Sequence, residues 1–264
     1  MSRVREPAVA GIFYPADAPA LRREVARCLA EAVPDTAGGP PPKAIIAPHA
    51  GYIYSGPVAG SAYARLKPLR GRIRRVVLLG PAHRVGFRGL AASGAEAFRT
   101  PLGDLPVDRA ALRALGDLPQ VREYDTAHAL EHSLEVHLPF LQEVLGEFQI
   151  VPLVVGDSEA AEVAEVLERL WGGPETLVVI SSDLSHYQDY ASARTRDADT
   201  SRAIETLQPE AIDYEDACGR NPVNGLLLVA RRHGYVVETI DLRNSGDTAG
   251  SRDRVVGYGA YVLH

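Results

Sequence analysis

Three short apolar runs, each followed closely by a histidine, constrain the fold of this chain more than any other feature. The runs are Ile45–Ala47 before His49, Val76–Leu79 before His83 and Val178–Ile180 before His186. Short β-branched runs bounded by Gly, Pro and Ser are typical of buried strands in a largely parallel sheet. Ligands of an open α/β sheet bind beyond the carboxyl ends of its strands. We therefore expect the three histidines to converge, and imidazole is the commonest protein ligand of a metal ion.

Strand-like and helix-like segments alternate along the whole sequence, which predicts an α/β fold with a parallel sheet. The expected strands are 43–47, 75–80, 148–155, 176–181, 235–242 and 254–263. The expected helices are 18–33, 57–66, 108–116, 133–146, 158–170, 190–206, 209–217 and 222–233. Residues 34–42 are expected to form a Pro/Gly-rich loop, 87–107 a β insertion and 117–132 an irregular segment. A length of 264 residues suits one large domain, so we predict a single domain over residues 1–264.

Composition excludes several classes of function. A net charge of −6 argues against nucleic acid as the main partner, because phosphate binding needs a basic face. Two cysteines do not make a disulfide framework. The N-terminal residues lack the apolar stretch of a signal peptide, and no run is long enough for a membrane span. We therefore expect a cytoplasmic protein with neither a membrane nor a nucleic acid as partner.

Asp183 and His186 form a candidate acid/base pair. A carboxylate three residues before a histidine can orient the imidazole or raise its basicity. The alternative is that Asp183 is the N-cap of a following turn, a position that Asp fills well. Both interpretations are compatible with the sequence.

His132 and His137 belong to a segment that superficially resembles a zinc protease helix. Metalloprotease histidines stand four residues apart on one helix face, whereas His132 and His137 stand five apart. That spacing turns the second ring by roughly 140° around a helix, so one helix cannot direct both to one metal. The zinc protease interpretation is rejected. His132 can still reach a pocket from the helix start, and His137 is expected to be structural.

The two cysteines fall in different settings. Cys28 lies on the apolar face of an early helix and is expected in the core. Cys218 precedes Gly219 in an expected turn between two helices. From its spacing alone it is either a buried filler or a thiolate ligand, and thiolate binds Zn, Fe or Cu.

Several motifs, spread in order over the whole chain, are similar to those of the Memo family, whose prokaryotic members are called AmmeMemoRadiSam system protein B. They are Arg5–Pro15, Pro48–Tyr52 with Ser55–Gly56, Gly80–His83, Glu131–Pro139, Ser181–His186 and Cys218–Gly219. The resemblance implies a three-layer sandwich around a mixed, largely parallel sheet, as in class III extradiol dioxygenases.

The same resemblance implies roles for individual residues. It makes His49 and His83 metal ligands, and it puts Cys218 where the dioxygenases supply a carboxylate. His186 then matches their acid/base histidine, with Asp183 beside it. His132, Tyr52 and Glu135 are expected to line the pocket. Iron is the expected metal, with copper or zinc as alternatives, because a thiolate is softer than a carboxylate.

Two functions follow from the resemblance. In the first, the chain is an enzyme with a mononuclear metal and a dioxygenase-like, other redox or hydrolytic reaction on an unassigned substrate. In the second, it is a non-catalytic protein that carries a metal or binds a peptide or partner, working with AMMECR-type and radical SAM proteins. The exchange of carboxylate for cysteine puts dioxygen activation in question, and fold alone does not decide function.

Overall fold

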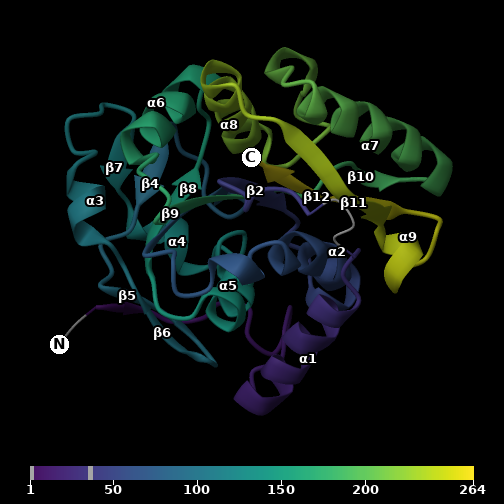
Figure 1. Ribbon diagram of the computed structural model, residues 1–264, viewed down its shortest axis with the longest axis horizontal. Coiled ribbons are helices and arrows are strands. Elements are labelled where there is room, and N and C mark those ends of the chain that lie inside the picture. Colours follow the sequence, from purple (N-terminus) through teal and green to yellow (C-terminus); the bar gives the residue numbers. More distant parts are fainter. Residues whose placement is uncertain (1–2, 35–37) are drawn as a thin grey trace.

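A nine-stranded mixed sheet forms the centre of the molecule (Figure 1). The computed structural model describes residues 3–34 and 38–264, so the first two residues and part of the expected 34–42 loop lie outside the described residues. The strands of the sheet are β2 (Ala44–Ala47), β3 (Arg75–Pro81), β4 (Leu90–Ala92), β7 (Val121–Glu123), β8 (Gln149–Val155), β9 (Thr176–Ser181), β10 (His186–Gln188), β11 (Val237–Asn244) and β12 (Val255–Leu263). A separate three-stranded sheet consists of β1 (Val4–Arg5), β5 (Ala97–Thr100) and β6 (Gly103–Pro106).

The four central strands of the main sheet run parallel, in the order β2-β9-β3-β8. Their residues are almost all apolar and fully buried, as a strand covered on both faces requires. The register pairs Ala47 with Ser181 and Leu79 with Ile180, so β2, β9 and β3 end at the same edge. The strands that flank this core, β12 and β4, pair antiparallel to it.

Helices cover both faces of the sheet (Figure 1). One face carries α1 (Ala18–Ala30), α2 (Tyr52–Ala64) and α5 (Leu138–Leu145), and the other carries α6 (Ala160–Leu170), α7 (Tyr190–Glu205) and α8 (Arg220–His233). The shorter helices are α3 (Arg109–Arg113), α4 (Asp125–Ala129) and α9 (Ser245–Thr248), with 3₁₀ turns η1 (Lys67–Leu69), η2 (Glu135–His137) and η3 (Pro209–Ala211). This arrangement confirms the α/β class, whereas the closer likeness to extradiol dioxygenases stays a prediction.

Glycines let α1 and α2 approach closely. A Cβ at Gly60 would lie 2.3 Å from the carbonyl oxygen of Cys28, and one at Gly56 would lie 2.7 Å from its Sγ. Cys28 itself is fully buried, which confirms its expected place in the core. The crossing positions the start of α2, which directly follows His49 and Gly51 in the chain.

The expected start of α2 is wrong. Pro57 suggests a first helical turn, but the helix begins five residues earlier, at Tyr52, and Pro57 lies inside it. A proline in a helix removes the N–H bond to the carbonyl four residues before it, here that of Ile53, and its ring crowds that carbonyl, which bends or weakens a helix without always ending it. The loop expected between the first strand and this helix is therefore shorter than predicted.

Four other segments also differ, in whole or in part, from the expectation. The helix expected over 133–146 is the 3₁₀ turn η2 followed by α5, and the helix expected over 209–217 is reduced to η3. The segment 117–132 is not wholly irregular, because it holds β7 and α4. The segment 87–107 holds the expected short strands, but β4 joins the main sheet, while β5 pairs with β6 and with β1. Tertiary pairing decides such short elements, and local periodicity does not report it.

Candidate metal centre

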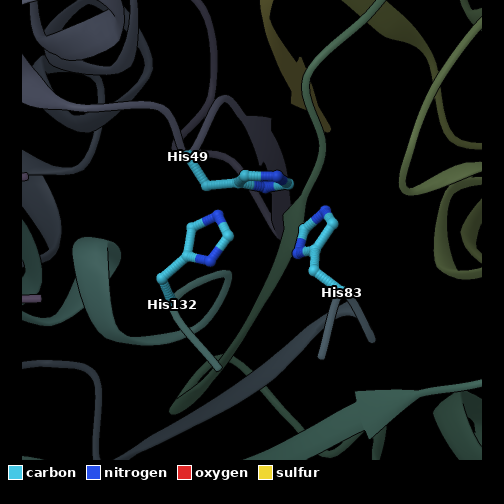
Figure 2. Close-up of side chains that lie close together, drawn as sticks. All are labelled: His49, His83 and His132. Carbon is cyan, nitrogen blue, oxygen red and sulfur yellow. The ribbon is translucent and has the colours of Figure 1, made fainter. Parts of the chain in front are cut away.

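Three histidines meet at the carboxyl edge of the parallel strands (Figure 2). His49 follows the end of β2, His83 follows β3, and His132 lies between α4 and η2. One ring nitrogen of each lies within 4.8 Å of the others, a spacing that can hold one metal ion. The ring centroids are 5.0 Å apart for His49 and His83, 5.5 Å for His49 and His132, and 4.7 Å for His83 and His132.

A chain of hydrogen bonds determines which nitrogen of His49 faces the centre. The Ser181 hydroxyl lies 2.6 Å from the Ser133 carbonyl, to which it must donate because a carbonyl only accepts. The same oxygen lies 2.6 Å from His49 Nδ1 and therefore accepts a hydrogen bond from the Nδ1–H group. Burial, followed by the neighbouring histidines, holds the pKa of His49 well below its usual value, so the ring is neutral. Nε2 thus presents its lone pair to the centre.

Glu131 does the same for His83. Its Oε1 lies 2.9 Å from His83 Nδ1, and its Oε2 accepts the His83 backbone N–H at 2.6 Å. Oε1 also accepts the backbone N–H groups of His132 and Ser133, each at 2.9 Å. Burial raises the pKa of Glu131, but the hydrogen bonds from His83 and from these amides lower it by more, to about 2. A carboxylate behind a ligand histidine is the usual outer support of a metal site.

His132 completes the cluster with a looser support, since its Nδ1 lies 3.4 Å from Glu131 Oε1 without forming a hydrogen bond. Its ring stacks on His83 at an interplanar angle of 20° and contacts Phe13 at 4.8 Å. Its Nδ1 is buried and has no hydrogen-bond partner among the described residues. The sequence placed His132 in the pocket but did not single it out as a ligand.

Cys218 contacts His49 but is not among the three residues whose ligand atoms cluster within 4.8 Å of one another. Its Sγ is 3.4 Å from His49 Nε2 and accepts the backbone N–H of Asp183 at 3.3 Å. Nitrogen and sulfur ligands of one tetrahedral ion stand about 3.6 Å apart, given metal–ligand bonds of about 2.1 and 2.3 Å. Burial raises the pKa of the Cys218 thiol, and the nearby Asp183 charge raises it further. A thiolate therefore forms here only with a cation beside it.

Asp183 contacts His49 through the backbone. Its Oδ1 accepts the His49 N–H at 2.7 Å, and its Oδ2 lies 4.0 Å from His49 Nε2. Burial raises the pKa of Asp183 to about 6, against the opposing influence of His186. No helix begins among residues 182–189, all of which are described, so the N-cap alternative is wrong.

His186 begins β10, where it pairs with Val256 of β12, and so it does not lie in a loop as expected. His186 opposes the raised pKa of Asp183 and helps to lower the pKa of His49, so it lies near the centre. The next residue, Tyr187, has a positive φ of 59° and is 64% exposed. A left-handed non-glycine residue is uncommon and here turns the chain directly after His186. The acid/base role of His186 and Asp183 stays a prediction.

The remaining expected pocket residues have structural contacts. The Tyr52 hydroxyl donates to the Val136 carbonyl at 2.6 Å. Glu135 is fully buried and accepts the N–H groups of Ala8 and Val9. It also accepts a bond from the Tyr14 hydroxyl and pairs with Arg5. Their roles in a pocket stay predictions.

His137 is buried, and its Nδ1 lies 2.8 Å from the Tyr63 hydroxyl. It lies outside the histidine cluster, in agreement with its expected structural role.

Sequence reasoning missed Ser181 and Glu131. Glu131 directly precedes His132, the same kind of proximity that drew attention to Asp183 and His186. Ser181 ends an apolar strand that registers with the strand before His49, and this polar residue at the sheet edge is the available signal.

Comparison with known proteins identifies the family. The family model described as Memo-like protein matches residues 5–262. The chain belongs to the Memo family. A MEMO1 family protein from Aeropyrum pernix is 38% identical over 98% of this chain and 99% of that protein. One from Aquifex aeolicus is 38% identical over 97% of each, and one from Thermotoga maritima is 35% identical over 98% of this chain and 99% of that protein.

The resemblance of the sequence motifs to the Memo family is thereby confirmed. Among solved structures, an uncharacterized protein from Escherichia coli K12 is similar over 81% of this chain and 98% of that chain, with 14% identity and a TM-score of 0.49. That similarity is too low to support an argument about function. Among residues 3–34 and 38–264, no helix combines the length and apolar character that a bilayer crossing needs.

Proposed function

We propose that this member of the Memo family binds one divalent metal ion through His49, His83 and Cys218 and uses the ion in catalysis. One observation carries the proposal: two histidines whose Nδ1 atoms are committed to Ser181 and Glu131 direct their remaining nitrogens to a common point. A purely structural histidine needs no such pair of outer supports.

The third ligand distinguishes two versions of the site. Cys218 Sγ stands 3.4 Å from His49 Nε2, the separation of two ligands on one ion, and so we assign it as the third ligand. His132 brings one ring nitrogen to the same point, which makes it the alternative third ligand. A set of imidazole and thiolate donors suits iron, which we propose as the native metal, and also copper or zinc.

His186 and Asp183 are the proposed proton-handling groups. When bound, the metal supplies Lewis-acid or redox chemistry to a substrate at the edge of the sheet. The pKa of Asp183, raised by burial to about 6, lets this carboxyl exchange a proton near neutral pH. His186 lies close enough to influence that carboxyl. The reaction class we propose is a dioxygenase-like or other redox or hydrolytic conversion, in a cytoplasmic protein of one domain.

A second function, metal-dependent binding of a peptide or partner, is favoured by the surroundings of the site. Large apolar side chains that usually avoid water are exposed next to site residues: Leu130, 66% exposed, precedes Glu131, and Tyr187 follows His186. Exposed apolar groups beside a site mark contact surfaces for other molecules. The proposed partners for this function are an AMMECR-type protein and a radical SAM enzyme.

Anaerobic metal analysis of the purified protein tests the proposal. The wild type is expected to retain a stoichiometric metal, and His49→Ala and Cys218→Ser are expected to lose it. His233→Ala, at the exposed end of α8, changes the same residue type as His49→Ala and serves as the matched control. Stoichiometric metal in both His49→Ala and Cys218→Ser would overturn the ligand assignment. Loss in His132→Ala together with retention in Cys218→Ser would transfer the third position to His132.

The two functions differ in what His186→Ala does. For an enzyme, this variant keeps the metal but loses substrate turnover or O₂ consumption. For a binding protein, it leaves capture of the AMMECR-type or radical SAM partner unchanged, while removal of the metal abolishes that capture.

A further inference from the structure

A small cavity adjoins the candidate metal centre. It has a volume of about 240 Å³, and its walls come from the carboxyl ends of β3 and β8 and from the start of α8. The residues that matter here are Val85, Phe87, Tyr214, Cys218, Arg220 and Asn221. We call it the Arg220 cavity. Because Cys218 is part of its wall, an occupant of the cavity reaches the candidate centre.

Arg220 is a cation without a partner in this wall. Its Nε is buried and makes no hydrogen bond, and its guanidinium has no ion pair among the described residues. Its contact is with the ring of Tyr214, whose centroid lies 5.9 Å from the guanidinium carbon. A guanidinium stays charged at any physiological pH, and this one is half-buried, so an anion in the cavity would give its charge a partner.

Nearby acidic residues do not neutralise Arg220. Arg196 engages Asp216 at 3.1 Å and Glu215 at 3.5 Å. Asp157 also lines the cavity, but it is exposed, so water screens its charge. Asn221 donates its amide to the Gly156 carbonyl at 2.9 Å and so holds the start of α8 against the end of β8. The Arg220 guanidinium therefore has no ion-pair partner among the described residues and is available to an anion in the cavity.

The other walls indicate the rest of the occupant. Val85, Phe87 and Pro222 present apolar surface, and the volume lies below the roughly 300–1,000 Å³ of pockets for drug-sized ligands. A carboxylate matches the planar fork of a guanidinium with two parallel hydrogen bonds. A small molecule with one carboxylate and a compact apolar part fits both the charge and the size.

We propose that the Arg220 cavity is a subsite for a small organic carboxylate, held by Arg220 and directed toward the candidate metal centre. The inference rests on the proposed metal function, and it names the substrate class of that site. The carboxylate anchors the molecule at α8, its apolar part contacts Phe87 and Val85, and its far end approaches Cys218.

Calorimetric titration of the zinc-loaded protein with benzoate tests the subsite. Arg220→Gln is expected to weaken benzoate binding at least about tenfold, because a charge-assisted hydrogen bond is lost. Arg220→Lys keeps the positive charge but loses the planar guanidinium, so its affinity for benzoate is expected to lie between those of the wild type and Arg220→Gln. Benzamide, the neutral analogue, is expected to bind the wild type as weakly as benzoate binds Arg220→Gln. Arg231→Gln, near the other end of α8, is the matched control and should bind benzoate like the wild type.

Three results would overturn the subsite: no benzoate binding, equal affinity in the wild type and Arg220→Gln, or tighter binding of inorganic phosphate at the same residue. Metal content measured on the same samples separates this inference from the proposed function. Metal retention without Arg220-dependent binding refutes the subsite alone. If the protein takes up no metal, the metal function fails, and titration of the metal-free protein still tests the cavity.

A cobalt-loaded sample tests the link to the centre. Benzoate is expected to change its visible absorption, because the wall of the cavity includes Cys218. An unchanged spectrum at saturating benzoate would refute the directed arrangement.

Discussion

At the scale of single residues, Ser181 and Glu131 determine what the histidines can do. Each residue binds the Nδ1 atom of one histidine, Ser181 that of His49 and Glu131 that of His83. The Nε2 atom of each ring is then left available to a metal ion. Arg5 adds to this support, since it donates to the backbone carbonyls of His128 and Glu131 and so holds the segment that carries His132.

Ser181→Ala is expected to lower metal affinity by about ten- to a hundredfold, the usual effect of losing an outer partner of a ligand histidine. Without the hydroxyl, His49 Nδ1 has no acceptor and the ring is free to change tautomer. Competition with a chromophoric chelator measures the affinity. Ser192→Ala removes an exposed hydroxyl from α7 and provides the comparison. Unchanged affinity in Ser181→Ala would contradict the role given to the serine.

Buried His128 predicts an acid-sensitive fold. Its Nε2 donates to the Ala91 carbonyl at 2.9 Å, and burial lowers its pKa from 6.5 to about 4. Between pH 6.5 and 4 the unfolded chain therefore binds a proton at His128 more readily than the folded protein does. The contribution of neutral His128 to the free energy of unfolding is complete above pH 6.5 and is lost as the pH falls toward 4. The gap between the two pKa values corresponds to about 3 kcal/mol.

Urea unfolding of metal-free protein between pH 4 and 8 measures this contribution. His128→Gln keeps a donor for Ala91 but cannot be protonated, so its stability is expected to fall less steeply below pH 6.5 than that of the wild type. At pH 8, where the wild-type ring is neutral, the pH-dependent difference vanishes. Parallel pH profiles for the two proteins would refute the assignment.

At the scale of elements, the start of α8 must fit closely against the end of β9. A Cβ at Gly219 would lie 2.5 Å from the Ser181 carbonyl oxygen and 2.7 Å from the Ser182 Cβ. The Gly219 N–H donates to the Ser182 hydroxyl at 3.0 Å. This contact holds Cys218 beside His49, and only a residue without a side chain permits it.

Gly219→Ala is therefore expected to displace Cys218 and to reduce metal content along with stability. Gly234→Ala, at the other end of the same helix, provides the matched comparison. Gly234 has a positive φ of 72° and nothing within 4 Å of an added Cβ, so its replacement costs roughly 1–2 kcal/mol of stability and leaves the metal content unchanged. Equal metal content in the two variants would contradict the importance of the Gly219 contact.

At the scale of the whole molecule, the N-terminal segment joins distant parts of the chain. Glu135 gathers Arg5, Tyr14 and the amides of Ala8 and Val9, all more than 120 positions away. The same segment places the ring of Phe13 against His132. The centre thus depends on residues from nearly the full length of the chain.

Arg5→Met is expected to destabilise the protein by about 3–5 kcal/mol, because it leaves the buried Glu135 charge without its cation. Hydrogen exchange is expected to rise in residues 3–15 and around His132. Glu6→Gln breaks an exposed pair with Arg99 nearby and should change neither measurement appreciably. A loss of stability as small as that of Glu6→Gln would show that Arg5 is not what secures the segment.

Part of this fold and site was predictable from the sequence. What could be predicted depends on local burial patterns, whereas the rest depends on packing between elements that are distant in the sequence. The strands before His49 and His83 were predicted because burial on both faces imposes continuous apolar runs. The start of α2 and the loss of the 209–217 helix were not, because they depend on packing against other elements. The motif resemblance drew attention to Cys218, whereas the convergence of His132 on the same point is visible only in three dimensions.

The sequence by itself determined the α/β class, the membership in the Memo family and the placement of His49 and His83 at one edge of the sheet. These follow from local burial patterns and from motifs, both of which are written along the chain. Only the tertiary structure decided which ring nitrogens face the centre, what supports them and where Arg220 lies without a partner. Those features arise from contacts between residues far apart in sequence, and no local pattern records such contacts.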